Sequence, residues 1–380
     1  MTPREILASP PSSAPLGTPA VVHPHTILVS LPTWQDLIDY ALRTPEHMAK
    51  VTIGYPRAFV HKSIRRLVEL CLQVVAKSDV KMCPADPVPM VFPTARILNE
   101  SVSFLTRKRP ADFCSDIQAI HFNISGPNGS RPDSLHLFIC PKELEKEVKS
   151  FWVTAGTGIS GRHAEYVLRR LELGATLQIT QAPCESLLNI SPGALEEKRT
   201  IRKRIADLLN GGDGNGSSLF YPAEQLVPGM RREVQPHDVF LYTTGMAAIW
   251  HAHQLTTCLS PELKVASFGY PYLDSLYVYR NWGEGVISYF SSDHDTNLRG
   301  FEQNIPSISA LITEFPPNPT LKSPNLARIR KLADEHGFLV VVDETVGNFV
   351  NTDTLQYADI ICTSLSKLFG GSCKRSERQV

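Results

Sequence analysis

The chain has 380 residues, enough for a large core and more than one domain, and its 38 Lys and Arg residues balance 38 Asp and Glu residues. A net charge of zero removes the strong basic signature that is typical of a nucleic-acid-binding protein. No apolar run approaches the roughly 18 residues of a membrane-spanning helix, and the first 20 residues lack the hydrophobic segment of a secretory signal.

The eight cysteines are scattered along the chain and form no CxxC pair. In an intracellular protein such cysteines are small buried residues or free thiols. The pairs His23/His25 and His251/His253 have a spacing that does not place two rings on one helix face, so we expect no metal site. These observations predict a cytoplasmic protein with no nucleic-acid, membrane or metal partner.

In the N-terminal part, Thr26–Tyr40 is expected to form a short strand and then a helix capped near Thr33. His61–Lys77 has the apolar spacing of an amphipathic helix. Between them lie Tyr55 and Arg57, a hydroxyl and a forked cation that together suit a phosphate. The local sequence alone favours the alternative, a surface arginine that packs on a tyrosine.

A literal GxGxxG, Gly156–Gly161, lies between the apolar run Phe151–Ala155 and a helix predicted over Arg162–Leu173. This arrangement is typical of a dinucleotide-binding turn, so an NAD-dependent oxidoreductase is one interpretation. The next run, Thr176–Thr180, should then end in an acid that holds the ribose, but Gln181 follows. The other interpretation is a glycine-rich strand-to-helix turn without a ligand.

From residue 195 onwards, helices and strands alternate. We predict helices over Leu195–Leu209, Ala247–Leu255 and Pro324–His336, and strands over Val239–Tyr242, Lys264–Phe268, Val286–Phe290, Ala310–Phe315, Phe338–Val342 and Ala358–Cys362. Such alternation predicts an α/β fold with a mostly parallel sheet and helices on both faces. In sheets of this kind, ligands bind beyond the carboxyl ends of the strands.

Reactive side chains gather where two of these strands end. The strand that begins at Phe338 delivers Asp343, and the next strand delivers Ser364, Ser366 and Lys367. A carboxylate, hydroxyls and one lysine on the same side suit an anionic aromatic cofactor with a protonatable ring nitrogen and an aldehyde. That cofactor is pyridoxal phosphate.

Earlier segments supply the remaining parts of such a site. The turn that opens a helix at Gly245–Met246 offers backbone N–H groups and the helix dipole to an anion. The strand that ends at Phe268 is followed by Tyr270 and Tyr272, and we expect Phe268 to cover a ring. Asn318 adds a side-chain amide.

In this order the motifs resemble the Cys/Met-metabolism family of pyridoxal-phosphate enzymes, which includes cystathionine γ-synthase, cystathionine lyases and O-acetylhomoserine sulfhydrylase. The stretches TTGMAAI, EFPPNP, VVVDET and SLSK match the family's motifs. The stretches LPTWQD, GYPRAFVHKSI, GTGISGRHAEY and TGMAAIWHAHQL are similar to the fungal cystathionine γ-synthase-like branch. The resemblance covers residues 16–370 and reassigns GTGISG to an ordinary loop.

The resemblance implies a role for each residue. Lys367 would bind the cofactor covalently and move protons at the substrate's α and β carbons, and Asp343 would keep the ring nitrogen protonated. Phe268 would stack on the ring where the family usually has a tyrosine, and Asn318 would bond to the ring oxygen. The phosphate would be held by Gly245, Met246, Ser364 and Ser366, and that of the neighbouring subunit by Tyr55 and Arg57. The protein would be a homodimer or homotetramer with a small amino-acid substrate.

The implied fold is the PLP-dependent transferase fold type I. We expect a disordered arm over residues 1–25, an N-terminal segment with a branch-specific insertion over 26–218, a PLP-binding domain over 219–370 and a divergent tail over 371–380. The tail after Gly371 resembles no part of the family, so we expect the PLP-binding domain to be incomplete. The small C-terminal domain is expected to be missing, together with the arginine that binds the substrate carboxylate.

The function that follows is γ-replacement or elimination on an O-acylhomoserine or a cysteine-type substrate, in transsulfuration or in a specialised-metabolite pathway. One alternative is a truncated, catalytically impaired homologue. The NAD-dependent oxidoreductase is a further alternative. The sequence leaves the acyl donor and the nucleophile open.

Overall fold

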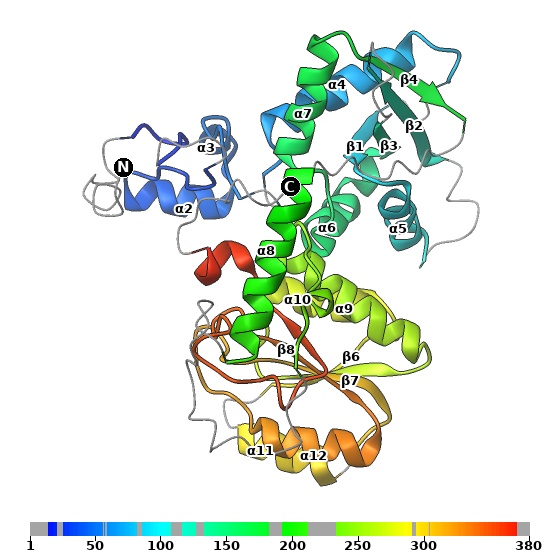
Figure 1. Cartoon of the computed structure of the whole chain (residues 1–380). Helices are drawn as coiled ribbons and strands as arrows, with labels where there is room; N and C mark the ends of the chain where they lie inside the picture. Colours follow the sequence, from blue (N-terminus) through cyan, green and yellow to red (C-terminus); the bar gives the residue numbers. More distant parts are fainter. Residues whose placement is uncertain are drawn as a thin grey trace. The chain divides into compact units, whose positions relative to one another are not determined.

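The computed structural model describes residues 14–20, 26–55, 57, 59–81, 86–107, 116–126, 133–181, 192–211, 233–290, 294–303 and 305–370. These residues form two compact units (Figure 1). Unit 1 holds those from 14 to 153 and from 157 to 181, and unit 2 holds 154–156 and 192–370. The boundary expected at residues 218/219 and the tail expected over 371–380 both lie outside the described residues.

Residues 14–20 belong to the arm that the composition predicts to be disordered, yet they are hydrogen-bonded to the rest of unit 1. The Gly17 N–H donates to the Ser30 carbonyl at 3.0 Å, and the Ser30 hydroxyl donates to the Ala14 carbonyl at 2.7 Å. Gly17 has a φ of 76° and lies against the backbone of Lys50, which leaves no room for a side chain. The arm expectation therefore fails for this segment.

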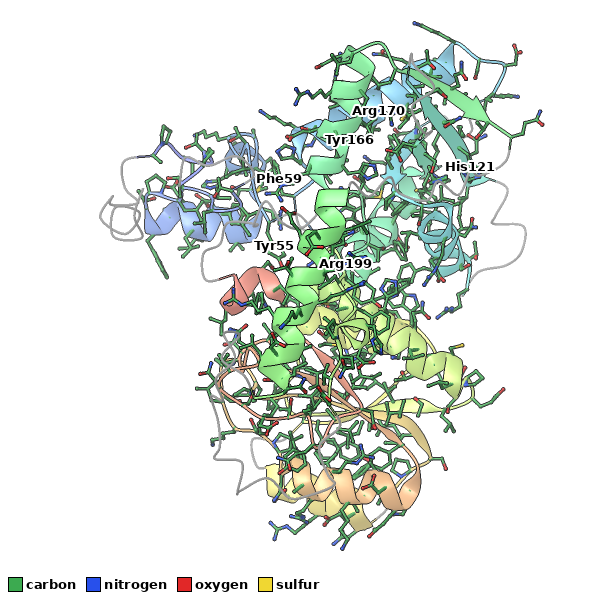
Figure 2. All side chains as sticks on the ribbon, viewed as in Figure 1. Tyr55, Phe59, His121, Tyr166, Arg170 and Arg199 are labelled. Carbon is green, nitrogen blue, oxygen red and sulfur yellow. The ribbon has the colours of Figure 1, made fainter. Side chains whose placement is uncertain are left out.

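Unit 1 is built on a four-stranded antiparallel sheet with the strand order β1-β3-β2-β4. Its elements are α2 (Trp34–Leu42), α3 (Pro45–Met48), α4 (Lys62–Ala76), β1 (Pro87–Phe92), α5 (Ala95–Thr106), β2 (Gln118–Ser125), β3 (Asp133–Pro141), η3 (Lys142–Leu144), α6 (Glu145–Ala155), α7 (Gly161–Glu172) and β4 (Thr176–Thr180). Figure 2 labels Tyr166 and Arg170 of α7, where the guanidinium lies 5.7 Å from the ring centroid. The expected cap is confirmed, because Thr33 forms a capping box with Asp36 at the start of α2.

Unit 2 is built on a five-stranded parallel sheet with the strand order β6-β5-β7-β8-β9. Its elements are α8 (Pro192–Leu209), η5 (Pro236–Asp238), α9 (Gly245–Leu259), β5 (Lys264–Phe268), α10 (Leu273–Asn281), β6 (Val286–Tyr289), α11 (His294–Gln303), β7 (Ile308–Glu314), α12 (Leu326–His336), β8 (Leu339–Asp343), β9 (Ile360–Cys362) and η6 (Leu365–Phe369). The expected α/β fold with a parallel sheet is therefore confirmed for this unit.

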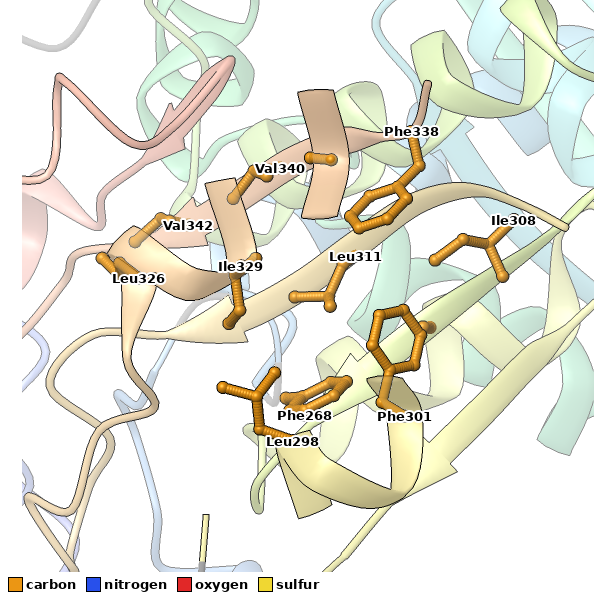
Figure 3. Close-up of a cluster of buried hydrophobic side chains, with 12 residues drawn as sticks. Phe268, Leu298, Phe301, Ile308, Leu311, Leu326, Ile329, Phe338, Val340 and Val342 are labelled. Carbon is orange, nitrogen blue, oxygen red and sulfur yellow. The ribbon is translucent and has the colours of Figure 1, made fainter. Parts of the chain in front are cut away.

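Helices cover both faces of the parallel sheet. On one face, α11 and α12 pack on the strands through buried side chains that include Leu298, Phe301 and Ile329 (Figure 3). On the other face, α9 contacts β7, β8 and β9, and α10 packs on α9. Because alternate residues of a strand point to opposite faces, each strand is apolar on both sides, which explains its unbroken hydrophobic run.

One predicted strand is absent from the sheet. Residues 239–242 follow η5 as an extended segment with no strand partner among the described residues. Phe240 is 70% exposed, so the apolar run does not mark a buried strand here. None of the described helices is long and apolar enough to cross a membrane.

Candidate functional site

The candidate site lies at the carboxyl edge of the parallel sheet in unit 2. Asp343 is the last residue of β8, and it lies in register with Glu314 of β7 and Cys362 of β9. All three strands run in the same direction, so the loops that follow them emerge at one edge. Those loops carry the residues that the sequence singled out.

Asp343 is fixed by a residue two positions further along the chain. The Thr345 hydroxyl donates to Asp343 Oδ1 at 2.6 Å, and the Thr345 N–H donates to the same oxygen at 3.0 Å. The Ser364 N–H in turn donates to the Thr345 hydroxyl at 3.0 Å. Thr345 therefore joins the loop after β8, which carries the acid, to the loop after β9, which carries the lysine.

The electrostatics of Asp343 suit a carboxylate that faces a cation. Burial raises the pKa of Asp343 above its usual value, while the two Thr345 hydrogen bonds and the Lys367 ammonium act in the opposite direction. A positive group placed against the carboxylate would favour its ionised form. The site thus supplies an acid that gains from a cationic ligand.

Lys367 lies beside an aromatic ring. Its Nζ atom is 5.4 Å from the ring centroid of Tyr272, and the side chain of Lys367 is exposed. Tyr272 precedes α10, and its hydroxyl donates to Asp274 Oδ2 at 2.9 Å. The structure therefore places Tyr272, rather than Phe268, next to the lysine.

Phe268 lies in the core and not at the candidate site, which corrects the expectation that it covers a ring. It is only 1% exposed and lies beside Leu298 in the cluster of buried side chains (Figure 3). Its ring stacks on Tyr289 with centroids 4.9 Å apart. It shares one face of the sheet with Val342, whereas Val341 and Asp343 line a small cavity on the other face. The period of two along a strand thus turns Phe268 away from the acid.

The beginning of α9 approaches the loop after β9 closely. A Cβ atom on Gly245 would lie 2.7 Å from the Ser364 Cβ, so only glycine allows this approach. The Ser364 and Ser366 hydroxyls are 3.3 Å apart. Gly245 and Met246 open the helix, where N–H groups have no carbonyl partner within the helix. Two hydroxyls and a helix N-terminus therefore converge, as an anion site requires.

Asn318 follows β7 in the loop that contains two cis prolyl bonds. It is exposed, and its N–H donates to Glu314 Oε2 at 3.4 Å. The same carboxylate accepts the Tyr272 N–H through Oε1 at 2.5 Å. The structure therefore links the loop of Asn318 to the loop of Tyr272.

Tyr55 and Arg57 belong to unit 1 (Tyr55 is labelled in Figure 2). Arg57 is 7% exposed and donates to the Val153 carbonyl at 2.6 Å. Its guanidinium lies 5.3 Å from the Tyr55 ring centroid. The arginine therefore packs on the tyrosine as the local alternative expects, but it is buried and not at the surface. The role at a neighbouring subunit stays a prediction.

Comparison with known proteins gives two matches to family models. Residues 63–160 match the N-terminal domain of fungal trans-sulfuration enzymes, and residues 234–374 match the Cys/Met metabolism PLP-dependent enzymes. The part of the chain from residue 234 to residue 374 is therefore similar to the Cys/Met-metabolism family of PLP-dependent enzymes. The cofactor of this family is pyridoxal phosphate.

Several curated fungal proteins are similar to the chain over most of its length. Cystathionine gamma-synthase-like enzyme iboG1 of Amanita muscaria is 34% identical over 94% of the chain, and cystathionine gamma-synthase of Neurospora crassa is 29% identical over 92%. Alanine racemase ungC of Aspergillus violaceofuscus is 29% identical over 95%. The chain spans 65%, 68% and 64% of these three relatives, respectively.

The residues at the sheet edge fit pyridoxal phosphate. The acid, the lysine and the paired hydroxyls match the ring nitrogen, the aldehyde and the phosphate of that cofactor. In addition, the Thr363 hydroxyl is buried and has no hydrogen-bond partner among the described residues. A buried polar atom without a partner is costly, and a polar ligand in the site would relieve that cost.

The GTGISG stretch does not have the surroundings of a dinucleotide site. The run before it, Phe151–Ala155, is the end of α6 and not a strand, so the glycines join two helices. In unit 2, the Gly156 carbonyl accepts the Thr244 hydroxyl at 3.0 Å. Gly156 has a φ of 64° and lies against Thr244, so this glycine supports the start of α9. The NAD interpretation is therefore overturned.

Sequence reasoning missed three residues of the site. Thr345 lay inside the VVVDET motif and Glu314 inside EFPPNP, but neither was given a role. Tyr272 is one of the aromatic residues that follow β5. Only the structure, in which Phe268 points into the hydrophobic core, shows that Tyr272 and not Phe268 lies at the site. A threonine two residues after a strand-end acid is a signal that could have identified Thr345, since it reaches back to the carboxylate.

Proposed function

We propose that this chain binds pyridoxal phosphate through Lys367 and performs cystathionine γ-synthase-like chemistry, γ-replacement or elimination, on an O-acylhomoserine or cysteine-type amino acid. The observation that carries the proposal is the pair of hydrogen bonds made by the Thr345 hydroxyl, which donates to Asp343 and accepts the Ser364 N–H. It connects the acid to the segment that bears the lysine. Two of the similar fungal proteins are named cystathionine gamma-synthase-like enzyme and cystathionine gamma-synthase, which supports this chemistry, and we extend the proposal to a role in transsulfuration or specialised metabolism.

The residues of the chain divide the work by their positions. Asp343 would keep a proton on the ring nitrogen, and the cofactor, when bound, would supply an electron sink. Gly245, Ser364 and Ser366 hold the phosphate, which fixes the ring against the sheet edge. Lys367 would hold the cofactor at its aldehyde carbon, and the amine of Lys367 would be the group that moves a proton at the substrate's α carbon. Tyr272 takes the stacking role that the resemblance had assigned to Phe268.

The remaining assignments complete the proposal. Asn318 faces the ring oxygen, and Met246 adds a second backbone N–H to the phosphate site. Tyr55 and Arg57 reach the phosphate site of a neighbouring subunit, which requires at least a homodimer. Light scattering that gives the mass of a single chain at micromolar concentration would contradict this assembly. We place the reaction in the cytoplasm.

The direct test is turnover. Purified protein loaded with pyridoxal phosphate is incubated with O-acetylhomoserine, O-succinylhomoserine, cystathionine or cysteine, with and without a thiol nucleophile, and the products are identified by mass spectrometry. We expect a keto acid or a thioether from at least one substrate, and no product from Lys367→Ala. A loaded protein that converts none of them would favour the catalytically impaired homologue instead.

A further inference from the structure

Glu314 is an acidic residue of the site that the proposed chemistry does not use. It ends β7 beside Asp343, and its two carboxylate oxygens point to two different loops. Oε1 accepts the Tyr272 N–H at 2.5 Å, and Oε2 accepts the Asn318 N–H at 3.4 Å. One carboxylate therefore links the loop after β5 to the loop after β7.

The two linked residues are the ones expected to touch opposite parts of the cofactor. Tyr272 lies next to Lys367, and its ring is tied by its hydroxyl to Asp274. Because the Tyr272 N–H also donates to Glu314, the residue is fixed both at its backbone and at its hydroxyl. Asn318 has an exposed side chain, so the bond from its backbone to Glu314 is what anchors it to the sheet.

We propose that Glu314 is a positioning residue, whose ionised carboxylate holds the loops of Tyr272 and Asn318 in place for the cofactor. This inference rests on the proposed function, because it needs a cofactor at this edge of the sheet. A carboxylate accepts N–H bonds more strongly than a neutral carboxyl group does. The loops of Tyr272 and Asn318 are therefore held firmly for the cofactor only when Glu314 has lost its proton.

The charges around Glu314 place its titration at neutral pH. Burial, and then the neighbouring Asp343, raise the pKa of Glu314 to about 7, against the lowering effect of the two N–H groups and of Lys367. Tyr279 of α10 faces the same region, and burial together with Asp343 raises the pKa of its phenol, so it stays neutral. Lys367 is a cation whose charge favours the ionised form of Glu314.

The sign of the pH effect follows from this pKa. As the pH falls through about 7, Glu314 gains a proton and its grip on both N–H groups weakens, so cofactor affinity falls. The stability of the cofactor-free protein changes in the opposite sense. The raised pKa means that the folded state binds the proton more tightly than the unfolded state, so this group's contribution falls as the pH rises toward 7.

The test measures binding of deoxypyridoxine phosphate, which lacks the aldehyde and so does not react with Lys367. Calorimetry at about pH 6 and about pH 8 compares wild type with Glu314→Gln, Glu314→Asp and the control Glu284→Gln. Glu284 is exposed in the turn between α10 and β6, so its variant controls for the loss of a carboxylate outside the site. The pH dependence that remains in Glu314→Gln reports the titration of the ligand's own phosphate. Thermal unfolding of each cofactor-free protein shows whether it is folded.

We expect the wild-type and Glu284→Gln proteins to lose several-fold to about tenfold affinity at the lower pH, and Glu314→Gln to lose much less, starting from a weaker affinity at the higher pH. Glu314→Asp keeps the charge and should keep the pH dependence. Equal losses in Glu314→Gln and wild type between the two pH values would overturn the proposal. A wild type that binds the analogue at neither pH would overturn the proposed function as well.

Discussion

At the scale of single residues, Thr345 connects the two loops of the candidate site by hydrogen bonds. It bonds to Asp343 through both its hydroxyl and its N–H, and it accepts the N–H of Ser364. A hydrogen bond to a charged group contributes roughly 1.5–3 kcal/mol, more than one between neutral groups. Loss of the Thr345 hydroxyl would therefore disturb the position of Asp343 and that of Ser364, which is proposed to hold the phosphate.

We expect Thr345→Val to weaken pyridoxal phosphate binding about tenfold, since it removes the hydroxyl that orients Asp343 and leaves the Ser364 N–H without its acceptor. The matched control is Thr345→Ser, which keeps the hydroxyl and should bind within about twofold of wild type. Fluorescence titration with the cofactor measures both. Equal affinities for the Val and Ser variants would contradict the role of the hydroxyl.

At the scale of elements, the start of α9 and the loop after β9 are held together by the absence of a side chain at Gly245. A methyl group there would press on Ser364 at 2.7 Å, which is closer than real Cβ atoms approach. Neither segment can retreat freely, because Ser364 is bonded to Thr345, and the α9 cap Thr244 is bonded to the Gly156 carbonyl. The contact is therefore a constraint on two elements.

We expect Gly245→Ala to lower the free energy of unfolding by about 2 kcal/mol, as overpacking does, and to weaken cofactor binding. The control is Gly300→Ala in α11, where a Cβ atom would meet nothing within 4 Å. That exposed helical position should gain up to about 1 kcal/mol, since alanine favours a helix over glycine. Urea unfolding measures both variants, and a Gly245→Ala protein as stable as wild type would count against the contact.

The sequence predicted the elements of unit 2 well because the information is local. The runs that form β5, β7, β8 and β9 are apolar on both faces. A strand of this kind is a continuous hydrophobic run, so it can be recognised without knowing which side chains point to which face of the sheet. The resemblance also indicated Asp343 and Lys367, which the structure brings to one edge.

What the sequence could not predict depends on non-local packing. Whether Phe268 or Tyr272 covers the site depends on which face of the sheet α11 and α12 occupy, and no local pattern states that. Val239–Tyr242 has strand composition but no neighbour to pair with among the described strands. The apolar run Phe151–Ala155, which a strand-to-helix turn would make a strand, is instead the end of α6. Its apolar side chains include Phe151 and Trp152, which pack on Phe92.

At the scale of the whole molecule, the chain combines two units of different construction. Unit 1 has an antiparallel sheet and matches the fungal N-terminal domain, and unit 2 has a parallel sheet and matches the PLP-dependent family. The acid, the lysine, the hydroxyls and the start of α9 all belong to unit 2. The central claim is therefore that the sheet edge of unit 2 binds the cofactor through Lys367.

Chemical trapping tests this claim most directly. The full chain is mixed with pyridoxal phosphate, reduced with borohydride, which fixes the cofactor to the lysine that holds it, and mapped by peptide mass spectrometry. We expect the label on Lys367, at close to one per chain, and its loss in Lys367→Arg. A label spread over surface lysines, or an unlabelled Lys367 in the folded protein, would contradict the account.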